Sequence, residues 1–208
     1  MILIIVLGLG ILLTQKAPHN TIRVACLGDS TTASTEFSDY PKILQSMLGT
    51  NYLVGNFGVI TATVLLNTNK PYLNQSSFEN AQNFRPNIII IMLGTNDAQV
   101  NNYLSIDKFK HDYEELINRI SASTSNARIF LVKPPPIFKN TLNLSNTNLV
   151  EGVIPRIEQL SNERSLPLID VYDILINHPE CFADGVHPNH DGARIIANEI
   201  YGAIVNDS

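Results

Sequence analysis

Residues 87–94, NIIIIMLG, are the most informative run for the architecture of this chain. Four successive isoleucines and a methionine leave no polar residue to face water, so the run predicts a strand buried on both faces. Strands of this kind occur in parallel sheets that helices cover on both sides. The run closes with a glycine, and Thr95, Asn96 and Asp97 follow it, so a buried strand leads into a polar loop.

Other apolar runs on either side of this one alternate with helical patterns. The runs 21–28, 52–58, 127–136 and 166–171 predict further strands, and three prolines stop the run 127–136. The predicted helices lie at 39–49, from about residue 105, around 150–160 with Pro155 in the first turns or at a kink, and at 190–204. Strand–helix alternation with short links predicts an α/β fold with a five-stranded parallel sheet covered on both faces.

Composition limits the class of protein. The 208 residues are 44% hydrophobic and 16% charged, which is typical of a globular chain. A net charge of −5 without any run of Lys or Arg argues against a nucleic-acid-binding surface. Two distant cysteines, Cys26 and Cys181, lack the spacing of a zinc site. One disulfide between them is conceivable, but the position of Cys26 in a predicted core strand favours two buried thiols.

The amino-terminal segment differs from the rest of the chain. Its apolar stretch, 2–13, is short for a bilayer span and suits the core of a signal peptide. We therefore expect residues 1–19 to be a signal peptide or hydrophobic segment, and 20–208 to form a single domain. This expectation predicts a secreted or cell-envelope protein whose mature domain has no stable membrane insertion.

Ligands of parallel α/β sheets bind at the carboxyl ends of the strands, so the residues that follow each strand are informative. One edge of the predicted sheet gathers a serine, a glycine amide, an asparagine, an aspartate and a histidine. They come from GDST (28–31), NFG (56–58), GTND (94–97) and, after the fifth strand and a short helical piece, DGVHP (184–188). These are the groups that acyl transfer requires.

Each group has a specific chemical use. Ser30 is the candidate nucleophile, and His187 is the base that would remove its proton. Asp184, three residues before the histidine, would orient the imidazole and stabilise its cation. The backbone amides of Ser30 and Gly58 and the side-chain amide of Asn96 would form the oxyanion hole.

Structural roles compete with this hypothesis at each position. The residues 29–31 could simply cap the next helix, Gly58 could serve only a turn, and Asn96 could belong to an ordinary polar loop. His190 and Asp191 are rival candidates for the base and the acid. The catalytic interpretation is favoured because all four motifs fall at the same edge of the predicted sheet in a workable order.

The same motifs resemble the four sequence blocks of the SGNH (GDSL-type) hydrolases. GDST, the glycine of NFG, GTND and DGVHPN match these blocks in order and spacing, from about residue 22 to 204. The resemblance implies a flavodoxin-like three-layer α/β/α sandwich with Ser30, Asp184 and His187 as triad. It adds Ser30, Gly58 and Asn96 as the oxyanion hole. Thr31 stands where Ile or Leu is more common in the family.

Longer stretches look like the sialate O-acetylesterase or carbohydrate acetylesterase branch of this family. They include YLVGNFGVITATVL (52–65) and CFADGVHPNHDGA (181–193). The branch implies a small-molecule or carbohydrate ester, with an acetyl or other small acyl group, as the partner of the site. It implies no metal and no organic cofactor.

Two alternative functions are compatible with the sequence. A lysophospholipase or thioesterase of the same fold would need an apolar acyl groove, to which Pro136, Ile137 and Phe138 after the fourth strand could contribute. A non-catalytic carbohydrate-binding module would keep the fold without the chemistry. The second alternative is disfavoured by the presence of Ser30, Asn96, Asp184 and His187.

Overall fold

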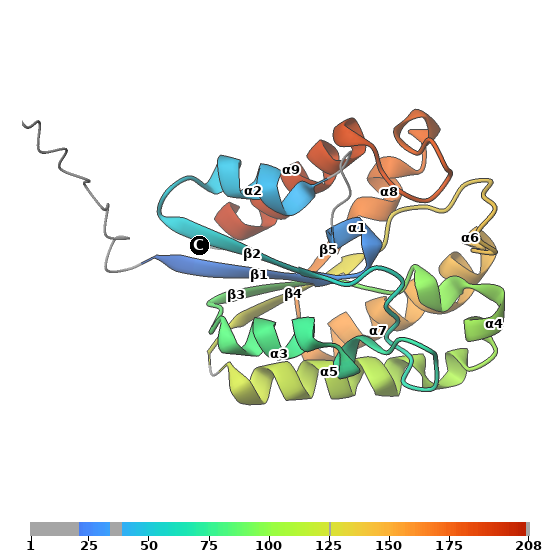
Figure 1. Ribbon diagram of the computed structural model, residues 1–208, viewed down its shortest axis with the longest axis horizontal. Coiled ribbons are helices and arrows are strands. Elements are labelled where there is room, and N and C mark those ends of the chain that lie inside the picture. Colours follow the sequence, from blue (N-terminus) through green and yellow to red (C-terminus); the bar gives the residue numbers. More distant parts are fainter. Residues whose placement is uncertain (1–20, 34–38, 125, 207–208) are drawn as a thin grey trace, which may run out of the picture.

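A single parallel sheet forms the centre of the molecule. The structure is a computed structural model and describes residues 21–33, 39–124 and 126–206 (Figure 1). Five strands lie in the order β2-β1-β3-β4-β5, and all neighbouring pairs are parallel. The strands are β1 (Ile22–Gly28), β2 (Tyr52–Gly58), β3 (Ile88–Met92), β4 (Arg128–Lys133) and β5 (Leu168–Asp170). The predicted five-stranded parallel sheet is thereby confirmed.

Helices cover both faces of this sheet and complete the predicted three-layer α/β/α sandwich. In Figure 1, α2, α8 and α9 lie above the sheet, and α3, α5 and α7 lie below it. The α-helices of the described residues are α1 (Ser30–Ala33), α2 (Tyr40–Leu48), α3 (Ser76–Asn83), α4 (Val100–Tyr103), α5 (Phe109–Ser123), α6 (Asn146–Asn148), α7 (Ile154–Arg164), α8 (Val171–Leu175) and α9 (His190–Asn206).

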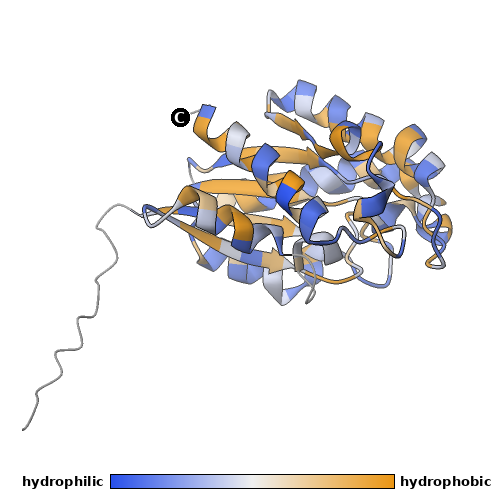
Figure 2. Cartoon of the chain, turned by 90° about the horizontal axis from the view of Figure 1, so that it is seen from above, coloured by the Kyte–Doolittle hydropathy of each residue, from blue (hydrophilic) through white to orange (hydrophobic). Residues whose placement is uncertain are grey.

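The isoleucine run explains why the sheet is covered on both sides. All five residues of β3 are buried. Ile89 and Ile91 pack into the apolar cluster between the sheet and α3, α5 and α7. Ile88, Ile90 and Met92 pack into the cluster between the sheet and α2, α8 and α9. Figure 2 shows the strands coloured mainly as hydrophobic and the helices with both hydrophobic and hydrophilic residues. Because strand side chains alternate between faces, a run without polar residues requires both layers.

Several element boundaries differ from the prediction for local reasons. The fourth strand ends at Lys133 because the prolines that follow it cannot donate ladder hydrogen bonds. A 3₁₀ turn (Ile106–Lys108) precedes α5, and a π-helical turn (Leu149–Val153) precedes α7, in whose first turn Pro155 lies. The helix α3 was not predicted, because Phe78 and Ala81 are its only buried residues.

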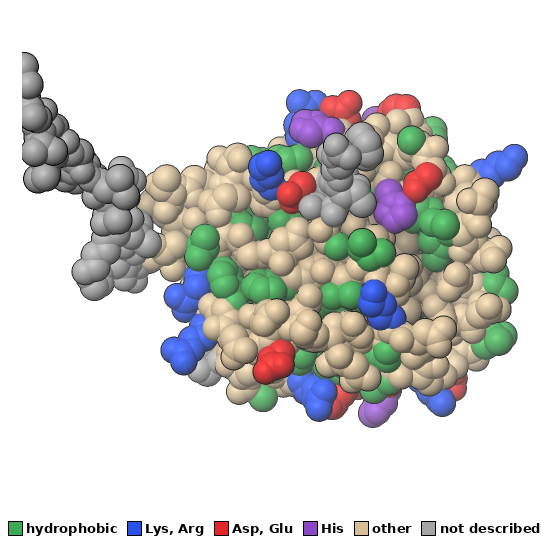
Figure 3. Space-filling model, in the orientation of Figure 1, with side chains coloured by type: hydrophobic (Ala, Val, Ile, Leu, Met, Phe, Trp, Pro, Cys, Tyr) green, Lys and Arg blue, Asp and Glu red, His purple; other side chains and the backbone are tan. Residues whose placement is uncertain are grey.

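Other predictions concern the cysteines, the surface and the amino-terminal segment. Cys26 and Cys181 are buried free thiols, as the sequence favoured. Charged side chains of both signs are scattered over the described surface of the face in Figure 3. Among the described residues, we find no helix with the length and apolarity needed to cross a membrane. The predicted signal-like segment, 1–19, lies outside the described residues, so its role stays a prediction.

Candidate active site

Ser30 begins α1, immediately beyond the end of β1. The Oδ1 atom of Asp29 accepts the N–H of Thr31 at 3.0 Å, and its backbone carbonyl accepts the N–H of Ala33 at 2.8 Å. A side chain at Gly28 would bring its Cβ to 2.0 Å from the Thr32 Oγ1 atom, so the sharp turn from strand to helix requires glycine there. The capping role considered for this cluster therefore belongs to Asp29, and these hydrogen bonds of Asp29 fix the position of Ser30.

His187 contacts both of its predicted partners. Its Nε2 atom lies 2.9 Å from Ser30 Oγ, and its Nδ1 atom lies 2.6 Å from Asp184 Oδ2. The other oxygen of Asp184 accepts the backbone N–H groups of Val186 (2.9 Å) and His187 (2.8 Å). Partial burial of Asp184 opposes its ionisation, but these hydrogen bonds outweigh burial, and the pKa of the carboxyl is below its ordinary value.

The rival base and acid lie elsewhere. His190 is exposed at the start of α9, and Asp191 is 3.6 Å from Arg194 across the surface of that helix. Of the remaining histidines within the described residues, His111 is exposed and His178 pairs with Glu180 at 2.8 Å. Only His187, among the described histidines, has a hydrogen bond to Ser30.

Asn96 lies beyond β3, in the short 3₁₀ helix Asn96–Ala98, and faces the same hollow as Ser30. One hydrogen of its side-chain amide goes to the carbonyl of Ala62 at 3.0 Å. The side-chain amide of Asn102 donates in turn to the backbone carbonyl of Asn96 at 2.8 Å. The second side-chain hydrogen of Asn96 is left for an acceptor in the hollow, since a carboxamide carries two donors.

A buried carboxylate next to Asn96 holds the segment that this asparagine contacts. Asp97 accepts the N–H groups of Val64 at 3.0 Å and Leu65 at 2.9 Å. Burial raises the pKa of Asp97 to about 7, although these two hydrogen bonds act in the opposite direction. The loop after β3 is therefore attached at three points to the loop after β2.

Gly58 has a packing role that the sequence did not suggest. A Cβ there would lie 2.1 Å from the backbone nitrogen of Ala33, so β2 and α1 approach closely only because this residue is glycine. Its N–H group donates to Asn56 Oδ1 at 3.0 Å, and the Asn56 amide donates to the Thr32 carbonyl at 2.7 Å. The predicted oxyanion donor is thus already hydrogen-bonded within the protein, and its catalytic role stays a prediction.

Three of the predicted residues, Ser30, Asn96 and His187, border a small hollow at the carboxyl edge of the sheet, whereas Gly58 and Asp184 do not line it. Its volume is about 270 Å³. Its walls combine hydrogen-bonding and apolar side chains from the five segments that follow the strands: Ser30, Ile60, Thr61, Asn96, Gln99, Asn102, Leu142, Leu144, Val186 and His187. Most of the wall residues escaped sequence reasoning because they lie in loops or very short helices, where no periodicity marks the face of a side chain.

The apolar residues considered for an acyl groove do not line this hollow. Ile137 is buried in the core, and the ring of Phe138 packs on Phe182 with a centroid distance of 5.1 Å. Leu142 and Leu144, further along the same loop, take the expected place. The three residues considered for the lysophospholipase or thioesterase alternative therefore do not supply the apolar lining, which comes from other residues of the same loop.

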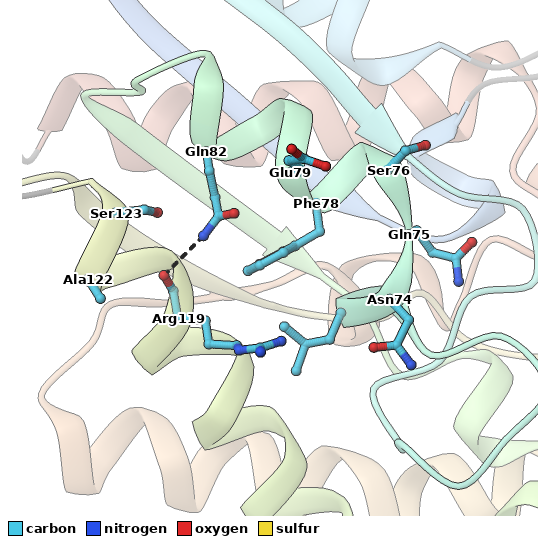
Figure 4. A pocket seen from close by; sticks show the side chains of 10 residues that line it. Asn74, Gln75, Ser76, Phe78, Glu79, Gln82, Arg119, Ala122 and Ser123 are labelled. Carbon is cyan, nitrogen blue, oxygen red and sulfur yellow. Dashed lines mark hydrogen bonds between the residues drawn. The ribbon is translucent and has the colours of Figure 1, made fainter.

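A wider hollow of about 740 Å³ lies between α3 and α5 (Figure 4). Its floor includes Phe78, and the side-chain amide of Gln82 donates to the Arg119 carbonyl at 3.3 Å across one end. None of the predicted catalytic residues lines it. Among the described residues, no group of three or more His, Cys, Asp or Glu side chains is placed to hold a metal ion.

A serine, a histidine and an aspartate thus lie in hydrogen-bond contact at the carboxyl edge of a parallel sheet, an arrangement that can activate a serine nucleophile. The GDSL-like Lipase/Acylhydrolase family matches residues 26–195, and the chain belongs to this family. The resemblance drawn from the four sequence blocks is thereby confirmed.

Individual relatives include proteins that act on acetylated carbohydrates. An acetylxylan esterase of Xylanibacter ruminicola is 31% identical over 209 residues, which cover 89% of this chain and 44% of the relative. The crystal structure of a carbohydrate acetylesterase from Sinorhizobium meliloti has a TM-score of 0.73 at 17% identity, over 90% of this chain and 100% of the other. The structure of an acetyl xylan esterase has a TM-score of 0.71 at 21% identity, over 88% of this chain and 100% of the other. These two structures bear out the fold.

The chain spans less than half of that Xylanibacter esterase. A second relative, a GDSL esterase/lipase from Oryza sativa subsp. japonica, is 18% identical over 136 residues, which cover 56% of this chain and 52% of the relative. The family match begins within β1 and ends in α9, so it includes the end of β1 and all of β2, β3, β4 and β5.

Proposed function

We propose that this chain is a serine esterase that removes small acyl groups, chiefly acetyl, from carbohydrates. The observation that carries the proposal is the pair of contacts at His187, 2.9 Å to Ser30 Oγ and 2.6 Å to Asp184 Oδ2. With its proton on Nδ1 and donated to Asp184, the imidazole presents the lone pair of Nε2 to the serine hydroxyl. The acetylesterase relatives support the choice of the acyl group.

The first half of the reaction forms an acyl-enzyme. His187 Nε2 takes the hydroxyl proton while Ser30 Oγ bonds to the ester carbonyl carbon, and the carbonyl oxygen becomes an oxyanion. The second amide hydrogen of Asn96 and the N–H of Ser30, which lies in the first turn of α1 and has no intrahelical acceptor, would stabilise this charge. The intermediate then expels the sugar oxygen, which takes the proton from His187.

Water completes the cycle by the same route. It gives a proton to His187, attacks the acyl carbon and forms a second oxyanion in the same place. Collapse of this intermediate breaks the bond to Ser30 and returns the proton to Oγ. Free acid and the original enzyme result, so every proton and bond is accounted for without a cofactor.

Acetate release tests the proposal directly. The protein and its Ser30→Ala variant are incubated with acetylated sugars and acetylated xylan fragments, and acetate is measured. We expect release by the wild type and a loss of several orders of magnitude in the folded variant, because the members of such a triad act as a unit. Sugar binding without acetate release, and without labelling of Ser30 by a fluorophosphonate, would instead support a non-catalytic carbohydrate-binding module.

The small hollow disfavours the lysophospholipase or thioesterase alternative. A volume of about 270 Å³ is at the lower end for a small-molecule site and leaves little room for a long acyl chain. Faster turnover of octanoyl than of acetyl p-nitrophenyl esters would favour that alternative.

A further inference from the structure

The loop after β4 is organised by one side chain. We name residues 138–145 the strap. The Oδ1 atom of Asn140 accepts the N–H groups of Leu142 at 2.9 Å and Leu144 at 3.3 Å. Its Nδ2 atom donates to the carbonyls of Phe138 at 2.9 Å and Leu144 at 3.0 Å. A single carboxamide thus satisfies four backbone groups of a segment that has no regular secondary structure.

The strap is attached to the loop that carries Asn96. The N–H of Val100 donates to the Asn143 carbonyl at 3.2 Å, and the N–H of Ser145 donates to the Ala98 carbonyl at 3.4 Å. The side-chain amide of Gln99 donates to the Leu142 carbonyl at 3.2 Å. These bonds fix the distance between the strap and the predicted oxyanion donor.

The other end of the strap is attached to the turn that carries His187. The N–H of Phe138 donates to the Gly185 carbonyl at 2.7 Å. Gly185 has a φ of 82°, and a Cβ there would lie 2.2 Å from the Lys139 carbonyl oxygen. Backbone therefore packs directly on backbone, and the strap joins the oxyanion side of the site to its base side.

Two leucines of the strap line the hollow beside Ser30. Leu144 is partly buried against the core, and Leu142 is 44% exposed. Ile60 and Val186 are the other apolar residues of the lining, whereas Thr61, Gln99 and Asn102 are polar. An acyl chain matches the apolar side chains, and the hydroxyl groups of a sugar match the polar ones.

We infer that the strap sets the upper limit on acyl length, with Leu142 and Leu144 as the wall and Asn140 as the positioning residue that holds them. This inference rests on the proposed esterase function. The four hydrogen bonds of Asn140 and the attachments at both ends of the strap keep Leu142 and Leu144 from moving away when a longer acyl chain binds. One methylene too many in a fixed apolar pocket changes kcat/KM by about 10- to 200-fold.

The test compares kcat/KM for p-nitrophenyl acetate, butyrate and hexanoate. We expect the wild type to prefer acetate. Leu142→Ala and Leu144→Ala should each raise the butyrate-to-acetate ratio about tenfold or more. Leu53→Ala is the matched control, because Leu53 lies on β2, outside the hollow, and is 48% exposed. It should leave the ratio unchanged.

Asn140 is tested by a pair of variants. Asn140→Ala should shift the ratio in the same direction as the leucine variants. Asn140→Asp should shift it less, because a carboxylate keeps the acceptor for Leu142 and Leu144. A merely structural role predicts lower thermal midpoints in both variants with the acetate preference retained.

The outcomes separate this inference from the proposed function. Wild-type turnover and fluorophosphonate labelling of Ser30, with unchanged ratios in the folded leucine variants, would overturn the inference alone. A wild type that is not labelled and hydrolyses none of the three esters would overturn the esterase proposal, and the inference with it. The leucine variants decide the matter even if the Asn140 variants do not fold.

Discussion

Replacing Asn96 by alanine removes two interactions at once, and the structure separates their effects. The hydrogen bond from the Asn96 amide to the Ala62 carbonyl is structural, and its loss should lower the free energy of unfolding by about 1 kcal/mol. In a chain of this length that change lowers the thermal midpoint by about 2–4 °C. The nearby segment should stay in place, because Asp97 still holds the N–H groups of Val64 and Leu65.

The second loss concerns the transition state. Removal of one oxyanion donor typically lowers kcat by about 100- to 1,000-fold. We expect the upper part of that range, since the N–H of Gly58 is already engaged by Asn56 and fewer donors remain. The KM should change little, because the missing bond forms fully only when the carbonyl oxygen becomes charged. Asn96→Asp should be at least as harmful, since a carboxylate would repel that charge.

Steady-state kinetics on p-nitrophenyl acetate and thermal unfolding of the same preparations supply both readouts. Asn118→Ala, the same substitution at an exposed position on α5, is the control and should alter neither. Folded Asn96→Ala protein with wild-type kcat would refute the oxyanion role. A large rise in KM at constant kcat would show instead that Asn96 binds the ground state of the substrate.

Three further predictions follow from contacts in and behind the site. His187→Ala should abolish turnover and His190→Ala should not, and the opposite ranking would show that His187 is not the base. Wild-type rates should fall in acid, because protonated His187 cannot accept a proton. Gly58→Ala should lower both the thermal midpoint and kcat, because the new Cβ meets the backbone of α1 and displaces Ser30; full activity would contradict this. The folded-state pKa of Asp97 is raised above the ordinary value of 3.8 to about 7, so the folded state holds a proton that the unfolded chain releases. Its contribution to stability is present below pH 4 and is lost as the pH rises to about 7. The thermal midpoint should therefore fall over this range, and less so in Asp97→Asn.

The sheet and the main catalytic candidates could be predicted because both depend on local patterns. Apolar runs identify strands wherever they are buried on both faces, and polar residues after those runs share one edge by topology alone. That reasoning placed Ser30, Asn96, Asp184 and His187 at one edge of the sheet, where the structure has them, although it could not fix the 2.9 Å contact between serine and histidine.

The features that escaped prediction depend on tertiary contacts. The helix α3 turns mostly polar side chains outward, so its sequence carries no strong apolar period. Asn140 and Asn56 act through hydrogen bonds between carboxamides and backbone groups, and any asparagine has the same capacity. Which of them organises a loop is decided by the surrounding backbone, and one sequence does not contain that information.

The hydrogen bond between His187 and Ser30 joins positions that lie 157 residues apart. The serine leaves the ribosome with the first strand of the sheet, whereas the histidine emerges after the fifth. Closing so long a stretch of chain is entropically costly and comes late in folding. A partly synthesised or partly refolded chain would therefore hold a nucleophile without its base and stay inert toward esters. Hydrolysis would begin only when the turn 184–187 docks on the sheet, so the lag before product appears after dilution from denaturant would time that docking.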